Sequence, residues 1–283
     1  MNNSKNIFDI VFLGLARNVS TTINSFMESC YKLSDTGLNI CVIIGENGSI
    51  DDTRKILKNY DPSKIKFHYI NTDFLNLYKN RIIRLTQGRE FLKNYLKENN
   101  IISNYISVVD LDEVIKDGIN VKQYLKALEI LEKNKKFFFA ISSKSNPYYY
   151  DMLPLKIIDY YEFDIYKIQR TFKIFNFYRN RKKYIYDFQK KISKMKDIST
   201  LSSHNGLTTY FYNDFMSGSY IDSNNEPIKS EHVNLNLSIN KKTKKFVLMT
   251  NTINLKTPQE HMPLNFSQFL INNFLKLIKF FKL

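Results

Sequence analysis

The sequence lacks the residues and segments that define several large classes of protein. It has two cysteines, Cys30 and Cys41, which cannot build a disulfide framework and whose spacing matches no zinc motif. Eight glycines in 283 residues exclude a collagen-like chain. No apolar run reaches the ~18 residues that a membrane-spanning helix needs. A short apolar run near the N-terminus has charged residues close around it. We interpret it as a buried strand rather than a signal peptide, and we expect a reducing cytosol as the compartment.

What is present is a globular composition with an excess of positive charge. Apolar residues make up 43% and charged residues 24%, so wholesale disorder is excluded. Lysine and arginine number 42 against 27 acidic residues, and the net charge is +15. Such a charge suits nucleic acid, an anionic membrane or a phosphate-bearing substrate as a partner. Richness in lysine, asparagine and isoleucine, with no tryptophan, is also typical of an A- and T-rich coding sequence, which explains part of the charge.

The first 120 residues alternate between strand and helix patterns. Continuous apolar runs, as expected of strands that are covered on both faces, and segments with helical spacing follow one another. The expected strands span residues 8–16, 39–49, 64–71 and 105–114, and the expected helices span 18–33, a segment starting at 51, and 78–98. This alternation predicts an α/β fold with a mainly parallel sheet flanked by helices. In such sheets, ligands bind at the carboxyl ends of the strands.

The second half is less regular, but it contains no internal repeat and no linker rich in proline, glycine or serine. We therefore predict one domain over residues 1–264. Residues 156–196, which are basic and aromatic, form an insertion in it, and residues 265–283 form a C-terminal amphipathic helix.

Charged and polar residues follow three of the expected strands. Arg17 follows the first, the loop from Glu46 to Asp52 follows the second, and Asp110 and Asp112 end the fourth. Because alternate strand residues point the same way, the two aspartates should present both carboxylates to one side. Carboxylate oxygens suit Mg²⁺ or Mn²⁺, and such an ion could neutralise a diphosphate leaving group.

These motifs resemble those of a known enzyme family. The matching pieces, in order, are GLARNV, ENGSIDDT, RIIRLTQGRE, VVDLDE, YYYD, SSHNGLTTY and SEHVNLN, over roughly residues 8–260. They are similar to nucleotide-sugar glycosyltransferases of the GT-A (Rossmann-like) fold, especially the bacterial capsule type and the fungal capsule-associated mannosyltransferase-like family.

The resemblance implies roles for individual residues. It implies that Asp112 binds the metal and that Glu231 is the catalytic base if the enzyme inverts configuration, with Asp151 the next candidate. Asp110 would contact the metal or the ribose, and the third metal ligand would be His232 or His261. The other residues implied to bind the nucleotide sugar or the acceptor are Ala16, Arg17, Glu46, Ser49, Asp52, Arg84, Arg89, Asn205 and Gly206.

The sequence thus predicts a glycosyltransferase that uses Mn²⁺ or Mg²⁺ and takes its sugar from a nucleotide diphosphate sugar donor. The acceptor would be a glycan or a lipid-linked molecule of a growing bacterial surface polysaccharide, either capsule or lipooligosaccharide. A sugar nucleotidyltransferase is an alternative, but it needs a glycine-rich loop where this chain has GLARNVS. A nucleic-acid-binding protein is another, through the basic and aromatic stretch 167–191. No nucleic-acid module surrounds that stretch, and we expect no nucleic-acid partner.

The C-terminal segment has the pattern of an interfacial helix. Its apolar face holds Phe266, Phe269, Leu270, Phe274, Leu277, Ile278 and Phe281, and its other face holds Lys276, Lys279 and Lys282. This pattern favours an anionic membrane surface, and hence a cytoplasmic enzyme that is peripheral on the inner face of the membrane. The alternatives are docking on the domain or dimerisation.

Overall fold

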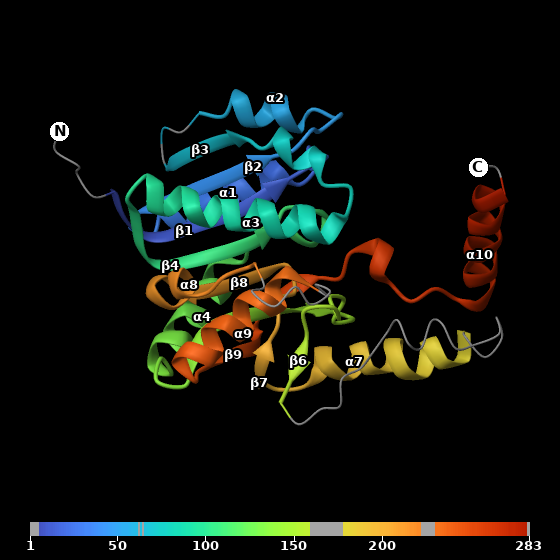
Figure 1. The fold of residues 1–283 in the computed structure, drawn as a ribbon. Helices are drawn as coiled ribbons and strands as arrows, with labels where there is room; N and C mark the ends of the chain where they lie inside the picture. Colours follow the sequence, from blue (N-terminus) through green and yellow to red (C-terminus); the bar gives the residue numbers. More distant parts are fainter. Residues whose placement is uncertain (1–5, 62, 64, 159–177, 222–229, 282–283) are drawn as a thin grey trace.

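The computed structural model describes residues 6–61, 63, 65–158, 178–221 and 230–281 (Figure 1). In this part of the chain one sheet has nine strands, in the order β3-β2-β1-β4-β8-β5-β9-β7-β6. The strands are β1 (Asn6–Ala16), β2 (Ile40–Glu46), β3 (Lys66–Asn71), β4 (Ile101–Asp110), β5 (Phe138–Asn146), β6 (Lys156–Ile157), β7 (Ile198–Ser202), β8 (Leu207–Phe211) and β9 (Phe246–Lys256).

The sheet divides into a parallel half and a mixed half. Strands β3, β2, β1 and β4 all run parallel to their neighbours, and β5 pairs parallel with β9. Strand β8 lies antiparallel between β4 and β5, and β7 pairs antiparallel with both β9 and β6. The predicted α/β class, with a sheet flanked by helices, is confirmed.

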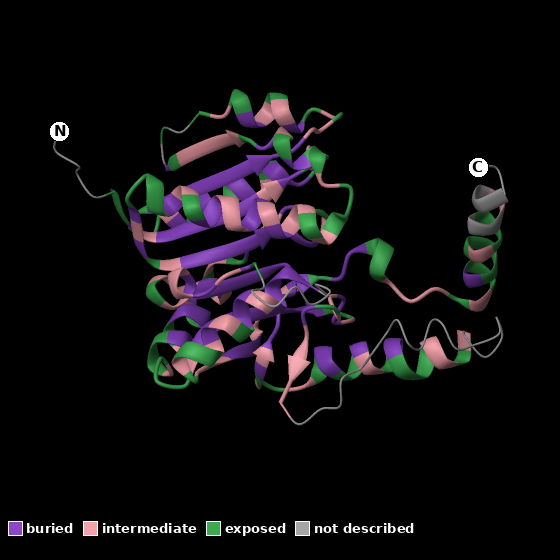
Figure 2. Ribbon diagram, viewed as in Figure 1, coloured by how far each residue is buried: buried purple, intermediate pink, exposed green. Residues whose placement is uncertain are grey.

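Alternation of buried side chains explains why the central strands form. In β1, Ile10 and Phe12 belong to one hydrophobic cluster, whereas Val11 and Leu13 belong to the cluster on the opposite face. Successive strand residues point to opposite faces, so a strand that is buried on both sides must be apolar throughout. Figure 2 shows the central strands buried along nearly their whole length.

Helices cover both faces of the sheet (Figure 1). The described helices near it are α1 (Ile23–Ser34), α2 (Thr53–Lys58), α3 (Arg81–Glu98), α4 (Val121–Lys133), α8 (Tyr212–Ser217) and α9 (Glu231–Thr243). Buried residues of α1, α2 and α4 belong to one cluster, and those of α3, α8 and α9 to the other. The short helices η1 (Asp73–Leu77), η2 (Glu113–Ile115) and η4 (Gln259–His261) lie in connections.

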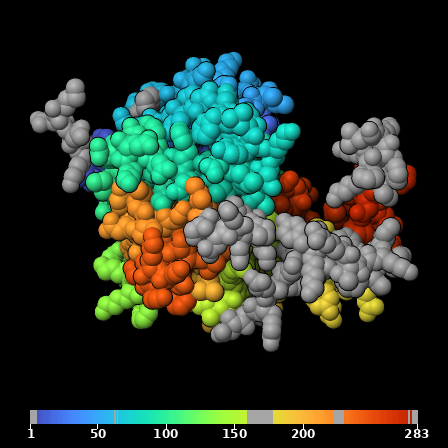
Figure 3. Space-filling view, in the orientation of Figure 1, coloured from blue at the N-terminus to red at the C-terminus, as the bar shows by residue number. Residues whose placement is uncertain are grey.

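Residues 156–196 carry β6, the π-helix η3 (Arg181–Tyr186) and α7 (Asp187–Lys194). Residues 159–177, which include the start of the stretch 167–191, lie outside the described residues. Lys144 on β5 holds the end of α7 to the sheet, because its buried Nζ donates to the carbonyls of Met195 at 2.7 Å and Lys196 at 2.9 Å. Figure 3 shows the N-terminal half, coloured blue to green, packed directly on the orange residues of the C-terminal half.

The predicted C-terminal helix is present as α10 (Phe266–Phe281), which stands apart from the sheet in Figure 1. Its first turn packs on the ring of Tyr178, with centroid distances of 5.2 Å to Phe266 and 5.3 Å to Phe269. Further along, Ile271 and Phe274 are 57% and 64% exposed. Lys276, Lys279 and Lys282 of the predicted basic face lie outside the side chains that the structure describes. None of the described helices is long and apolar enough to span a bilayer.

Candidate functional site

A cleft of about 660 Å³ lies at the carboxyl ends of β1, β2 and β4. The end of β1 contributes Ala16 and Arg17, and Asn47 follows β2. Helix α3 lines the cleft with three arginines, and the N-terminus of α9 closes the other side. The predicted residues among its lining are Ala16, Arg17, Arg84, Arg89, Asp110, Asp112, Asp151, Glu231, His232 and His261. The chain thus places them at one edge of the sheet.

Asp110 is the centre of this group. It is the last residue of β4, and one oxygen, Oδ1, accepts from the guanidinium of Arg89 at 2.6 Å. The other, Oδ2, lies 3.1 Å from Nε2 of His204. Burial alone raises the pKa of Asp110, but His204 and Arg89 outweigh it and hold this pKa well below its usual range. The carboxylate is therefore ionised at neutral pH.

Arg89 links two acids that are far apart in the sequence. Besides Asp110, its Nε donates to Oε1 of Glu231 at 3.2 Å, and the guanidinium is only 6% exposed. Its position follows from Gly88, where an added Cβ would lie 2.8 Å from Leu15 of β1, so α3 approaches the sheet closely at this point. Glu231 is in the first turn of α9, where the helix dipole also favours a carboxylate.

His204 is a site residue that the sequence analysis missed. It is fully buried in the loop before β8, where its Nδ1 lies 2.9 Å from the hydroxyl of Thr208 and its Nε2 faces Asp110. The segment SSHNGLTTY belongs to the resemblance described above, which implied roles for Asn205 and Gly206 but none for this histidine. No spacing in the sequence marks it, because its contact with Asp110 depends on the pairing of β8 with the distant β4.

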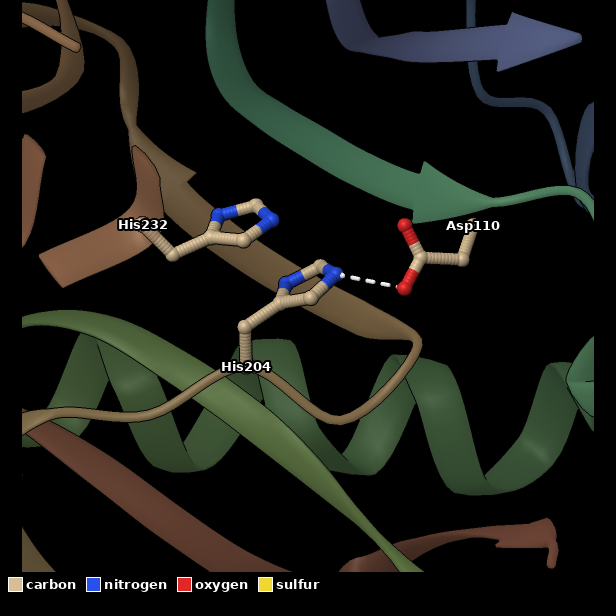
Figure 4. Close-up of side chains that lie close together, drawn as sticks. All are labelled: Asp110, His204 and His232. Carbon is tan, nitrogen blue, oxygen red and sulfur yellow. Dashed lines mark hydrogen bonds and ion pairs between the residues drawn. The ribbon is translucent and has the colours of Figure 1, made fainter. Parts of the chain in front are cut away.

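His232 lies face to face with His204, with ring centroids 3.7 Å apart and planes 13° apart (Figure 4). Burial, followed by the nearby His204 and Arg89, lowers the pKa of His232 well below its usual value, so the ring is neutral. Its Nε2 is 3.6 Å from Oε1 of Glu231, and its buried Nδ1 has no hydrogen-bond partner within the described residues.

These side chains could hold a metal ion. Asp110, His204 and His232 each offer one ligand atom, and the atoms lie within 4.8 Å of one another. One carboxylate with neutral imidazole suits a transition ion such as Mn²⁺ better than Mg²⁺, which prefers oxygen ligands. An imidazole lone pair lies in its ring plane, so the stacked rings hold their lone pairs in two separate, nearly parallel planes. Asp110 and one of the two imidazoles therefore fit a divalent ion. The other imidazole must rotate out of the stack before it can also coordinate the ion.

Asp112 lies beyond the end of the strand. We expected alternation along a strand to 114, but β4 ends at Asp110, and Asp112 is instead the N-cap of η2, accepting from the backbone N–H of Val114 at 3.1 Å. Its carboxylate still lines the cleft. Burial of the Asp112 carboxylate, followed by the negative charge of Asp110, raises the pKa of Asp112 to about 6. Such a group favours a nearby cation.

Residues of two other segments form the far wall. Tyr150 and Asp151 follow β5, and His261 ends η4. The His261 ring packs on Tyr150 at a centroid distance of 4.9 Å, and its Nε2 is 3.3 Å from Glu260. Burial, followed by the charges of Asp110 and Glu231, raises the pKa of Asp151 well above its usual range.

The predicted nucleotide-binding residues at the end of β2 and in the loop after it do not line the cleft. Glu46 is fully buried, and its Oε2 accepts from Nε of Arg54 at 2.5 Å while its Oε1 accepts from the N–H of Ser49 at 2.7 Å. The Ser49 hydroxyl accepts from the N–H of Asn18. Exposed Asp52 is the N-cap residue of α2 and makes no capping bond with its side chain. Glu46, Ser49 and Asp52 are not among the residues that line the cleft, and their roles toward a nucleotide stay predictions.

Asn205 and Gly206 also lie behind the cleft wall. Asn205 is fully buried, and its Oδ1 accepts from the N–H of Asp151 at 3.3 Å. Gly206 has φ of +87°, and its carbonyl accepts from the N–H of Asp110 at 2.8 Å. An added Cβ would lie 2.9 Å from the methyls of Val114, so the glycine serves the turn and its packing. Contact of either residue with a sugar stays a prediction.

No protein-family model matches the chain, and no curated protein sequence matches it. Among solved structures, it is similar to a 1–349 fragment of S. aureus TarS, at 10% identity and TM-score 0.45, over 87% of this chain and 59% of that one. The chain thus spans less than two thirds of that TarS chain. It is also similar to M. tuberculosis glucosyl-3-phosphoglycerate synthase, at 13% identity and TM-score 0.49, over 93% of this chain and 75% of that one. A structure of the same synthase in complex with Mn²⁺, uridine diphosphate and phosphoglyceric acid matches at 11% identity and TM-score 0.47, over 89% of this chain and 71% of that one.

Proposed function

We propose that this chain is a metal-dependent glycosyltransferase of the GT-A type. One observation carries the proposal: a single cleft at the carboxyl edge of the parallel strands joins the acidic end of β4 to the arginines of α3 and to Glu231 and His232 of α9. An acidic group suits a metal ion, and the arginines suit a diphosphate. The motif resemblance described above predicts the same combination.

The donor would lie along the edge of the sheet. Exposed Arg17 and the backbone around Ala16 would border the base and ribose, and Arg81 and Arg84 on the first turns of α3 would face the diphosphate. Guanidinium groups bind phosphate oxygens through charge-assisted hydrogen bonds. The volume of about 660 Å³ lies within the roughly 300–1,000 Å³ of small-molecule sites.

Asp110 and Asp112, with the imidazole of His204 or His232, would hold the divalent ion. When bound, such an ion supplies positive charge that stabilises the leaving nucleotide diphosphate. Arg89 pairs with both Asp110 and Glu231 and holds the two side chains in position. Its buried guanidinium would contribute a preorganised positive charge to the cleft.

The acceptor hydroxyl must lose a proton as it attacks the anomeric carbon. Glu231 is the candidate base of an inverting reaction, because its carboxylate lines the cleft and is paired with Arg89. Glu231→Gln should lower turnover by ~10²-fold or more while donor binding survives. Near-normal turnover would reject this role and favour Asp151 or a retaining reaction.

We further propose that the acceptor belongs to a bacterial surface polysaccharide, capsule or lipooligosaccharide, and that the enzyme works at the inner face of the cytoplasmic membrane. Helix α10 supports this, because Leu270, Ile271, Phe274 and Leu275 are at least 40% exposed on one helix. An exposed apolar face with lysines nearby in the sequence favours an anionic lipid surface. Docking of the same face on a second copy is the competing outcome.

A thermal-shift experiment tests the function. Nucleotide diphosphates and sugar nucleotides are added with and without Mn²⁺, and a ligand at 100 times its Kd should stabilise the fold by about 2.7 kcal/mol, or about 5 °C or more in Tm. Asp112→Asn should remove the metal-dependent part of the shift. Asp117→Asn, at an exposed position of the same connection, is the matched control and should keep it. If no nucleotide diphosphate raises Tm in the presence of metal, the proposal fails.

A further inference from the structure

A second cavity of about 270 Å³ adjoins the cleft and is not used by any role described so far. The two cavities share Tyr150, Asp151, Leu153, Glu260 and His261 in their walls. The rest of the second cavity comes from Met152 after β5, from η3 and α7 of the inserted segment, and from the chain before α10. A ligand in it would reach the cleft past Asp151.

Two buried polar atoms in this wall lack partners. Within the part of the chain that the structure describes, neither the Tyr150 hydroxyl nor Oε1 of Gln189 makes a hydrogen bond. The Gln189 amide is held in place because its Nε2 donates to the carbonyl of Tyr150 at 3.2 Å. An unpaired buried polar group is costly unless a ligand or ordered water satisfies it.

The chemistry of these atoms selects a ligand. Oε1 of Gln189 can only accept a hydrogen bond, so an ionised carboxylate, which has no donor, cannot satisfy it, whereas a hydroxyl can. The acidic side chain of Glu260 on the rim also opposes an anion. The cation in the wall, Arg181, already donates to the hydroxyl of Tyr186 at 2.9 Å and lies over its ring.

Apolar side chains complete the wall, among them Met152, Ile185 and Met262. Apolar walls with a few convergent hydrogen-bonding groups suit a sugar ring, which has C–H faces and hydroxyl edges. The cavity is just below the roughly 300–1,000 Å³ of typical ligand sites, which is room for one ring but not for a whole nucleotide sugar.

We infer that this second cavity binds one neutral sugar ring of the acceptor, with the Tyr150 hydroxyl and Oε1 of Gln189 as its hydrogen-bonding groups. The inference rests on the proposed function, since a sugar placed here would present a hydroxyl to the cleft beside Asp151. It names the acceptor class as a glycan rather than an anionic small molecule.

Ligand-detected saturation-transfer NMR on the full chain tests it. The probes are the methyl glycosides of glucose, galactose, mannose and N-acetylglucosamine, with inorganic phosphate as the anionic comparison. At least one glycoside should bind, and Tyr150→Phe, which removes one hydroxyl, should weaken it about fivefold or more. Gln189→Met should weaken it similarly. Tyr148→Phe is the matched control, because Tyr148 lines neither cavity, and it should bind as the wild type does.

The outcomes separate this inference from the proposed function. Glycoside binding that persists when a nucleotide diphosphate and Mn²⁺ fill the cleft supports an acceptor site. Displacement by a sugar nucleotide, but not by the nucleotide diphosphate alone, would assign the cavity to the donor's sugar and overturn the inference. A nucleotide-induced Tm shift without any glycoside binding that depends on Tyr150 would also overturn it and leave the glycosyltransferase proposal standing. Glycoside binding that depends on Tyr150, without any Tm response to nucleotides, would support a sugar-binding cavity and contradict the glycosyltransferase proposal.

Discussion

Replacing Arg89 by methionine should destabilise the protein by about 3–5 kcal/mol, because it leaves two carboxylates without their buried cation. The guanidinium is 6% exposed, 2.6 Å from Asp110 and 3.2 Å from Glu231. Methionine fills most of the volume of the arginine stem, so the cost is chiefly electrostatic rather than that of a cavity. Urea unfolding measures it as a lower midpoint at unchanged m-value.

A double-mutant cycle isolates the ion pair. Glu231→Gln removes one of the two charges, so Arg89→Met should cost about 1–3 kcal/mol less in that background than alone. Arg84→Met on the same helix, where the side chain is half-buried, is the matched control and should stay within about 1 kcal/mol of the wild type. A cost below about 1 kcal/mol for Arg89→Met, or additive effects in the cycle, would refute the reasoning.

Three further predictions concern other parts of the molecule. Burial lowers the pKa of Lys144 from 10.5 to about 8, so folding costs free energy below pH 8 and this cost disappears as pH rises to about 10.5. Relative to Lys144→Met, the wild type should gain about 2–3 kcal/mol between pH 7.5 and 10 in urea unfolding, and a constant difference would contradict this. Gly206→Ala should lower the free energy of unfolding by about 1–3 kcal/mol because of the φ of +87°. Adding Val114→Ala should relieve only the clash of the new methyl group with Val114 and not the backbone strain. An unchanged stability of Gly206→Ala would show that the turn relaxes freely. Deleting residues 270–283 leaves the contacts of Phe269 with Tyr178 in place, so Tm should hold while sedimentation with anionic vesicles falls, and aggregation or unchanged sedimentation would reject the membrane role.

The parallel half of the fold could be predicted from the sequence because each buried strand is a continuous apolar run. The segment expected at 8–16 is β1, and the segment expected at 64–71 is β3. The fourth strand was displaced: it runs from Ile101 to Asp110, because its polar residues at 103 and 104 hide the early start from a search for apolar runs. The order of β5 to β9 could not be predicted, since pairing between distant strands leaves no periodic trace in either strand.

The site was predictable where a residue follows a strand and not where it depends on a distant neighbour. Asp110 and Arg17 were found because the carboxyl ends of parallel strands meet at one edge. His204 was missed because it reaches Asp110 only through the antiparallel insertion of β8, a contact between residues 94 apart. Glu46 ends a strand too, but Arg54 reaches back and pairs with it, which strand position alone does not reveal.

The placement of β8 between β4 and β5 has a consequence for how the chain reaches its native state. The strand that completes the middle of the sheet is made about one hundred residues after β4, so a ribosome-bound chain with β1 to β4 already made still has an open edge at β4. Contacts between residues so far apart in the sequence form slowly, because the entropy lost in closing the long loop precedes the stabilisation from strand pairing. Asp110 and Arg89 are therefore synthesised before His204 and Glu231, and the cleft cannot be complete until β8 and α9 have been added. Variants that delay β8 should accumulate a partly folded chain with an exposed strand edge, the species most prone to aggregation during synthesis.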